Sequence, residues 1–288
     1  MKSGLILTSA ILAASVLASA CGNTKEAVQP SAVASTPVPS AAPAAPAVDY
    51  TQAIDQYRTY VIEQCNAYVK ATGEFTAAIK AGDLEKSKEL YAPARMYYER
   101  IEPIAESLGD LDPAMDAREG DVEEKDWRGF HRIEKGLWMD GKTHGQEGYA
   151  DQLLSDSKLL RAKVETVEID STLLLTGAVE LLNEVSSTKV TGEEERYSRT
   201  DLYDIAANVE GARKIFDVLK TEVEKKDAEL ARTIDGRFNN LFKVMEPYKK
   251  GSGYVLYTDL TQDQTKKLSQ AVDALAEPLS QMGKKLGA

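Results

Sequence analysis

Apolar residues recur at helical spacing through nearly all of this 288-residue chain, from about residue 50 onwards. The clearest run alternates steps of four and three residues: Leu90, Ala94, Tyr97, Ile101, Ile104 and Leu108. Such spacing places the apolar side chains on one face of a helix, which must be buried against other helices. The sequence shows no alternation of strands and helices, no long internal repeat and no glycine-rich phosphate loop. The pattern predicts an all-α fold, built as one helical bundle or as two in tandem.

Local signals set the expected breaks between helices. Pro93 and Pro103 are each expected to kink or break the helix that carries them. Asp112-Pro113 is expected to begin a helix, with the proline in its first position. Thr261 with Gln264 forms a capping-box start for the last helix. Besides a helix around His131, the periodic segments are 50–80, 90–108, 153–164, 173–185, 200–220, 227–246 and 261–282.

The N-terminus has the composition of a secretory signal peptide, predicted over residues 1–20. Lys2 is its only charge, and Leu5 to Leu17 is dominated by Leu, Ile, Val, Ala and Ser. This apolar region is too short to span a bilayer as a permanent helix. Cys21 directly follows small residues, an arrangement that resembles the lipobox of bacterial lipoproteins, where the cysteine carries the lipid. The alternative is ordinary cleavage that releases a soluble protein.

Residues 21–48 are predicted to be the lipidated cysteine and a disordered tether rich in proline and alanine. Five of the ten prolines of the chain fall within this segment. Such a composition cannot bury a core and remains extended. The remaining residues, 49–288, are enough for one large helical domain or two small ones with a real core.

The charge and the cysteines limit the classes of function. The formal net charge is −11, and removal of residues 1–20 with Lys2 makes it −12. This acidity argues against nucleic acid or anionic lipid headgroups as partners, and it is compatible with capture of cations. Cys65 is the only cysteine besides Cys21, so one chain can form neither an internal disulfide nor a thiolate zinc site after lipidation.

The most informative local motif surrounds one of only two histidines. His131 and Glu134 stand three residues apart, so they share one face of a helix. A neutral imidazole and a carboxylate on one face can supply half of a metal site, and helical bundles build metal sites in their cores from such pairs. The alternative is a surface contact between histidine and glutamate on an amphipathic helix.

Acidic residues on other helices are candidates to complete such a site. Glu102 belongs to a charged stripe of Arg95, Glu99, Glu102 and Glu106. Most stripes of this kind are solvated faces, but a kink at Pro103 could aim the Glu102 carboxylate. Asp151 and Glu210 are further candidates, and Glu210 has small neighbours. A histidine with several carboxylates suits iron or manganese and suits copper(I) poorly; zinc or copper can act as substitutes.

Catalysis is poorly supported, and the chain is predicted not to be an enzyme. A zinc peptidase of the HExxH type needs a second histidine four residues after the first, where this chain has Lys135. The other histidine, His144, lies in a glycine-rich loop and is expected to be exposed and idle. No nucleophile-elbow motif is present. Metallopeptidase activity remains the weakest of the alternatives.

Several blocks resemble the imelysin-like domain of the EfeO/EfeM family, which belongs to a bacterial iron-uptake system. The likeness extends over nearly all of residues 50–286, and its signature is Gly129 to Lys135. The further similar blocks are 91–95, 98–106, 116–119, 197–202, 207–212 and 274–279. The resemblance implies two tandem four-helix-bundle-like halves. It also implies a metal site at His131 and Glu134, completed by Asp151 and Glu210 and, less directly, by Glu102.

The resemblance further implies an exported, lipid-anchored iron-binding protein on the extracytoplasmic side of the bacterial cell membrane. Some family members carry an N-terminal cupredoxin domain, which this chain is expected to lack. The implied partners are a membrane permease of the EfeU type and a haem peroxidase of the EfeB type, with no nucleic acid. Some relatives bind acidic polysaccharide such as alginate, so polysaccharide binding is the alternative function.

Overall fold

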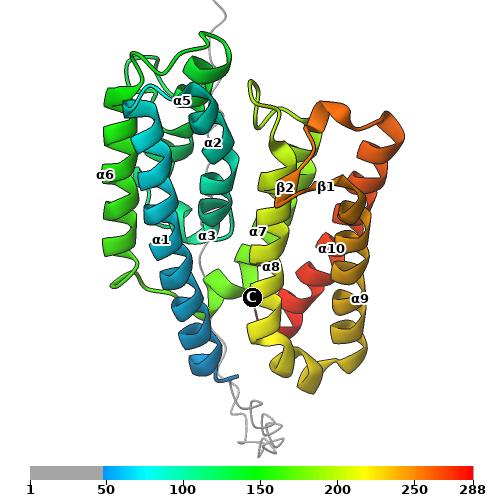
Figure 1. Cartoon of the computed structure of the whole chain (residues 1–288). Helices are drawn as coiled ribbons and strands as arrows, with labels where there is room; N and C mark the ends of the chain where they lie inside the picture. The colour runs from blue at the N-terminus through cyan, green and yellow to red at the C-terminus, as the bar shows by residue number, and fades with distance from the viewer. Residues whose placement is uncertain (1–47, 288) are drawn as a thin grey trace, which may run out of the picture. The chain divides into compact units, whose positions relative to one another are not determined.

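The computed structural model describes residues 48–287 (Figure 1). The predicted signal peptide, Cys21 and nearly all of the predicted tether lie outside the described residues. The described part is all-α, as predicted, and its helices form two halves. The first half consists of α1 (Thr51–Lys80), α2 (Leu84–Glu99), α5 (Phe130–Trp138) and α6 (Glu147–Lys163), with the short helices α3 (Glu102–Glu106) and α4 (Leu111–Asp116).

The second half is built from four long helices. These are α7 (Ser171–Ser187), α8 (Asp201–Lys226), α9 (Ala228–Met245) and α10 (Gln262–Leu286). Single 3₁₀ turns lie at Lys189–Thr191, Glu246–Tyr248 and Tyr257–Asp259, and two-residue strands β1 (Lys249–Lys250) and β2 (Gly253–Tyr254) form an antiparallel hairpin. In the part of the chain that the structure describes, no helix combines the length and apolar composition needed to cross a bilayer.

Short polar side chains fix the starts of four helices. Asp83, Asp170 and Asp227 each accept a hydrogen bond from a backbone N–H three residues ahead, at the starts of α2, α7 and α9. The capping box predicted for α10 is confirmed, because Thr261 and Gln264 bond reciprocally. These caps satisfy N–H groups that a helix leaves without internal partners.

The prolines behave differently from one another. The chain leaves helical geometry at Ile101 and restarts in α3, with Pro103 as its second residue, so the predicted break there is confirmed. At Pro93 a kink or a break was predicted, and a break is excluded, because α2 continues through this exposed residue. The start predicted at Asp112-Pro113 is also wrong. There α4 begins at Leu111, and the Asp112 carboxylate accepts a hydrogen bond from the Tyr98 hydroxyl instead.

An aromatic cluster anchors α5 inside the first half. The ring of Phe130 stacks on Phe75, with centroids 6.0 Å apart, and meets Tyr91 edge-on at 5.8 Å. Both partners come from the long helices α1 and α2, and all three rings are fully buried. Burial of aromatic rings dominates the stability of such cores. The cluster therefore fixes the first turn of α5, the turn that carries His131.

The two halves meet where α8 packs against α2 and α1. Asn208 of α8 donates a hydrogen bond to the backbone carbonyl of Glu99 at 2.9 Å. One turn later, a Cβ at Gly211 would lie only 2.5 Å from the carbonyl oxygen of Arg100. Glycine is therefore required for α8 to approach the end of α2 this closely.

Replacement of Gly211 by alanine should force these segments apart. We expect Gly211→Ala to lower the free energy of unfolding by about 1–3 kcal/mol, the usual range for overpacking a core. Gly236→Ala is the matched control, because Gly236 is an exposed position in α9 with no atom near the added Cβ. It should stabilise the protein by roughly 0.5–1 kcal/mol. Urea denaturation of both variants checks the pair, and equal effects would contradict the packing described.

Candidate metal centre

The segment before α5 is locked in place by two backbone contacts. Gly129 adopts φ of 90°, and a Cβ there would lie 2.3 Å from the carbonyl oxygen of Met115. The indole nitrogen of Trp127, a buried residue, donates to the carbonyl of Ala117 at 2.8 Å. Together these contacts hold the start of α5 against the end of α4. They bring His131 next to Asp116, although the two residues are 15 positions apart in the sequence.

His131 and Glu134 contact each other as the helical spacing predicted. The distance from His131 Nδ1 to Glu134 Oε2 is 3.2 Å. The interpretation of the pair as a surface contact is wrong, since the two side chains are only 2% and 0% exposed. The other oxygen of Glu134, Oε1, accepts hydrogen bonds from the backbone N–H groups of Tyr197 and Ser198 at 2.9 and 2.7 Å. Both oxygens of Glu134 are thus engaged.

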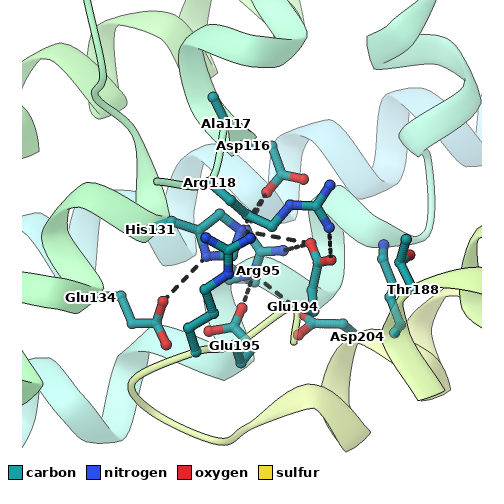
Figure 2. A network of polar contacts seen from close by, with 12 residues as sticks. Arg95, Asp116, Ala117, Arg118, His131, Glu134, Thr188, Glu194, Glu195 and Asp204 are labelled. Carbon is teal, nitrogen blue, oxygen red and sulfur yellow. Dashed lines mark hydrogen bonds and ion pairs between the residues drawn. The ribbon is translucent and has the colours of Figure 1, made fainter. Parts of the chain in front are cut away.

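The opposite nitrogen of His131 faces two further carboxylates (Figure 2). Nε2 lies 3.6 Å from Asp116 Oδ1 and 3.6 Å from Glu194 Oε1. It is buried, and no hydrogen-bond partner for it is found among the described residues. Asp116, His131 and Glu194 each offer a ligand atom within 4.8 Å of the others, which is close enough to hold one metal ion. A second such group, on the Nδ1 side, is His131, Glu134 and Glu195.

A buried guanidinium balances this concentration of negative charge. Arg95, on α2, is fully buried and forms ion pairs with five carboxylates (Figure 2). These belong to Glu99, Asp116, Glu194, Glu195 and Asp204. The planar guanidinium presents five donors, which suits it to a multiple buried ion pair. Arg95 therefore joins α2, the end of α4, the loop before α8 and α8 itself.

The charges shift the pKa values of the cluster in opposite directions. Burial raises the pKa of Asp116 and Glu194, but the effect of neighbouring cations is larger. Arg95 and His131 hold the pKa of Asp116 well below its usual range, and Lys189 with His131 lowers that of Glu194 to about 2. For His131, burial and the charge of Arg95 lower the pKa, but contacts with carboxylates raise it well above its usual value. These contacts favour the charged imidazolium in the metal-free centre.

Two of the predicted ligands lie elsewhere. Asp151 is an exposed residue of α6 and forms an ion pair with Lys80 at 2.7 Å. Glu210 is partly exposed on α8 and binds Arg100 at 2.7 Å. Neither belongs to a group of candidate ligands among the described residues. The structure does not bring either residue into the group around His131: Asp151 pairs with Lys80 at the end of α1, and Glu210 pairs with Arg100 just after α2.

The charged stripe on α2 and α3 is mostly buried, so its interpretation as a solvated face is wrong. Glu99 is fully buried and Glu102 is 4% exposed, whereas Glu106 is exposed. Lys189, also buried, pairs with Glu99 at 2.6 Å and with Glu102 at 3.1 Å. Burial raises the pKa of Glu102 well above its usual value, because Lys189 offsets only part of the effect. Glu102 does not contact His131 directly but belongs to a neighbouring acidic group.

Sequence reasoning missed the carboxylates that face Nε2 and the buried cations that balance them. Asp116 ends a six-residue helix, and Glu194 and Glu195 lie in the loop between α7 and α8. Periodicity carries no information about such positions, because they have no repeating spacing. The signal available was the acidic run Glu193-Glu194-Glu195, placed just before a helix start at Thr200. His144 is exposed, as expected.

The fold and the cluster define a class: an all-helical domain with a buried histidine–carboxylate centre. The family model described as Imelysin, in a family named for peptidases, matches residues 53–282. An "Efem/EfeO family lipoprotein" of Staphylococcus haemolyticus (strain JCSC1435) is 48% identical over 236 residues, covering 80% of this chain and 82% of the relative. A protein of the same name from Staphylococcus aureus (strain NCTC 8325 / PS 47) is 46% identical over 237 residues, which cover 80% of this chain and 84% of that relative. The chain belongs to the imelysin family and is of the EfeO/EfeM type.

Removal of the central cation should unbalance the cluster. Arg95→Met keeps an unbranched side chain but leaves buried carboxylates without their partner, so we expect a loss of about 3–5 kcal/mol in the free energy of unfolding. The loss should shrink as the pH falls, because the unpaired carboxylates can then take up protons. Lys70→Met removes an exposed ion pair with Glu74 and should leave stability nearly unchanged. Denaturation curves at two pH values test this, and a pH-independent loss would contradict it.

Proposed function

We propose that this protein captures iron on the extracytoplasmic side of the cell membrane and delivers it to a membrane permease of an Efe-type uptake system. The names of its relatives support the coarser part of this statement, a lipoprotein role in Efe-type iron uptake. The observation that carries the iron site is His131 Nε2, a buried nitrogen that faces two carboxylates and has no hydrogen-bond partner among the described residues.

Within this proposal, the cation binds to Nε2 of His131, Asp116 and Glu194. Glu134 is then a positioning residue, because it fixes the imidazole through Nδ1 rather than coordinating the ion. A carboxylate can only accept a hydrogen bond, so Nδ1 carries the proton and the lone pair of neutral imidazole is placed at Nε2. The helical HxxE spacing thus serves to orient the ring, and the ligands that complete the site come from α4 and the loop before α8.

The donor set favours iron over softer metals. One imidazole and two carboxylates form a site without sulfur, which suits Fe(II), Fe(III) or Mn(II), while zinc or copper(II) can substitute. The proposed route of the cargo runs from this site to an EfeU-like permease, with an EfeB-like haem peroxidase as a second partner. A lipid on Cys21 would hold the protein beside them at the membrane.

The contacts that occupy both oxygens of Glu134 favour a carrier over a metallopeptidase. A glutamate base must present a free oxygen to the metal-bound water. Here Oε2 contacts His131, and Oε1 accepts two backbone hydrogen bonds. The other histidine, His144, is exposed and lies beside Glu147. The protein is therefore proposed to bind and release its ion without catalysing a reaction.

The ligand and positioning roles predict different losses of affinity. His131→Ala should abolish saturable Fe(II) binding. Glu134→Gln should weaken it by about 10- to 100-fold, the usual effect of removing a group that orients a ligand. His144→Ala is the matched control and should bind as the unmodified protein does. Anaerobic calorimetric titration measures all three, and unchanged affinity in His131→Ala would overturn the assignment.

The raised pKa of His131 predicts that iron binding releases a proton. At neutral pH the metal-free imidazole is charged, so the ion must displace the proton from Nε2. Affinity should rise about tenfold per pH unit below the pKa of His131 and become constant above it. Titrations in two buffers of different ionisation enthalpy, at one pH, should report about one proton released per ion. Binding that is independent of pH between 6 and 8 would contradict a protonated His131.

A further inference from the structure

The loop before α8 supplies groups to both sides of the His131 ring (Figure 2). On one side, Glu194 places its Oε1 3.6 Å from Nε2. On the other side, the successive backbone N–H groups of Tyr197 and Ser198 both donate to Oε1 of Glu134. Two successive N–H groups directed at one anionic oxygen form a small anion-binding concavity. The path of this loop therefore decides where Glu194 points and how firmly Glu134 holds the imidazole.

The residue that follows these two N–H groups has a strained backbone. Arg199 has φ of 61°, and it is the one residue other than glycine with a positive φ in the described part of the chain. This left-handed conformation costs energy for any residue with a Cβ, so it persists only where surrounding contacts hold it. Arg199 lies two residues before α8, so its conformation sets the direction in which the loop joins that helix.

Contacts from the loop and from the far end of the second half hold Arg199 in this conformation. Its backbone N–H donates to the carbonyl of Glu195 at 3.0 Å, and its Nη1 donates to the carbonyl of Gly192 at 3.1 Å. Tyr257, a buried residue of the 3₁₀ turn after β2, donates its backbone N–H to the Arg199 carbonyl at 2.8 Å. The Tyr257 hydroxyl donates to the carbonyl of Val190. One residue thus ties together the two ends of the loop.

We propose that Arg199 and Tyr257 are positioning residues of the metal centre and form a clamp that sets how tightly the ion is held. Both act through the loop rather than by coordinating the ion. His131 and Asp116 belong to the first half, whereas Glu194 reaches them on a loop that the clamp fastens to the second half. Loosening of the clamp would let Glu194 move away from Nε2 and would free the N–H groups from Glu134. The proposal rests on the proposed iron-binding function.

Two substitutions of Arg199 separate the backbone conformation from the side chain. Both Arg199→Asn and Arg199→Val remove the guanidinium, but asparagine adopts the left-handed conformation readily and a β-branched valine does not. We expect Arg199→Val to weaken Fe(II) binding by about 10- to 100-fold, the usual effect of disturbing the groups that orient metal ligands. Arg199→Asn should bind nearly as the unmodified protein does. Anaerobic calorimetric titration measures the affinity. Urea denaturation of the metal-free variants runs beside it, because a purely structural role would lower the urea midpoint without changing the affinity.

A second pair of variants tests the other end of the clamp and decides the question if Arg199→Val does not fold. Tyr257→Phe keeps the ring and removes only the hydrogen bond to Val190. Tyr50→Phe is the matched control, because its hydroxyl also donates to a backbone carbonyl, that of Leu286 at the end of α10. We expect Tyr257→Phe to release Fe(II) faster than the unmodified protein, measured by transfer to excess bipyridine without oxygen. Tyr50→Phe should release it at the unmodified rate.

The outcomes separate the clamp from the function on which it rests. Equal affinities of Arg199→Val and Arg199→Asn, whether high or low, would contradict a role for the left-handed backbone. Unchanged release from Tyr257→Phe would likewise overturn the clamp, and both results would leave iron binding by the unmodified protein intact. Absence of Fe(II) binding in the unmodified protein would overturn the clamp and the proposed function together.

Discussion

The structure depends on the neutralisation of carboxylates buried between its two halves. Arg95 contacts five of them, and Lys189 holds Glu99 and Glu102. An isolated buried charge is very costly, so the acidic residues can remain inside only because these cations lie among them. The ion pairs also join α2 to α4, to the loop after α7 and to α8. These buried ion pairs therefore fix how the two halves meet and where the candidate ligands point.

The two ring nitrogens of His131 have different roles: Nδ1 makes a structural contact, and Nε2 is the proposed metal ligand. Nδ1 faces Glu134, whose other oxygen accepts backbone hydrogen bonds at Tyr197 and Ser198, so this side is tied to the loop. Nε2 faces Asp116 and Glu194, and the described part of the chain offers it no hydrogen-bond partner. A cation bound there would replace the proton on Nε2 and add positive charge to an acidic centre. Folding leaves this nitrogen without a hydrogen-bond partner among the described residues, which is the physical basis of the proposed affinity for a metal ion.

Local patterns in the sequence predicted what is local in the structure. Helical spacing identified the long helices, Thr261 and Gln264 identified a capping box, and the three-residue spacing predicted the contact of His131 with Glu134. Asp116 and Glu194 could not be found this way, because tertiary contacts bring them to His131 from a short helix and a loop. The stripe that includes Glu99 was misjudged for a related reason: its burial depends on Lys189, 90 residues away. Asp151 and Glu210 were chosen for their places on other helices and by family resemblance, and their side chains pair with Lys80 and Arg100.

The most direct test is the position of the ion itself. Crystals of the protein grown with Fe(II) without oxygen, or with Mn(II), would locate the metal by its anomalous scattering. The account predicts a peak within bonding distance of His131 Nε2, Asp116 and Glu194, with Glu134 still bound to Nδ1. A peak on the other side of the ring, between Glu134 and Glu195, would contradict it and would make Glu134 a ligand rather than the residue that orients the imidazole.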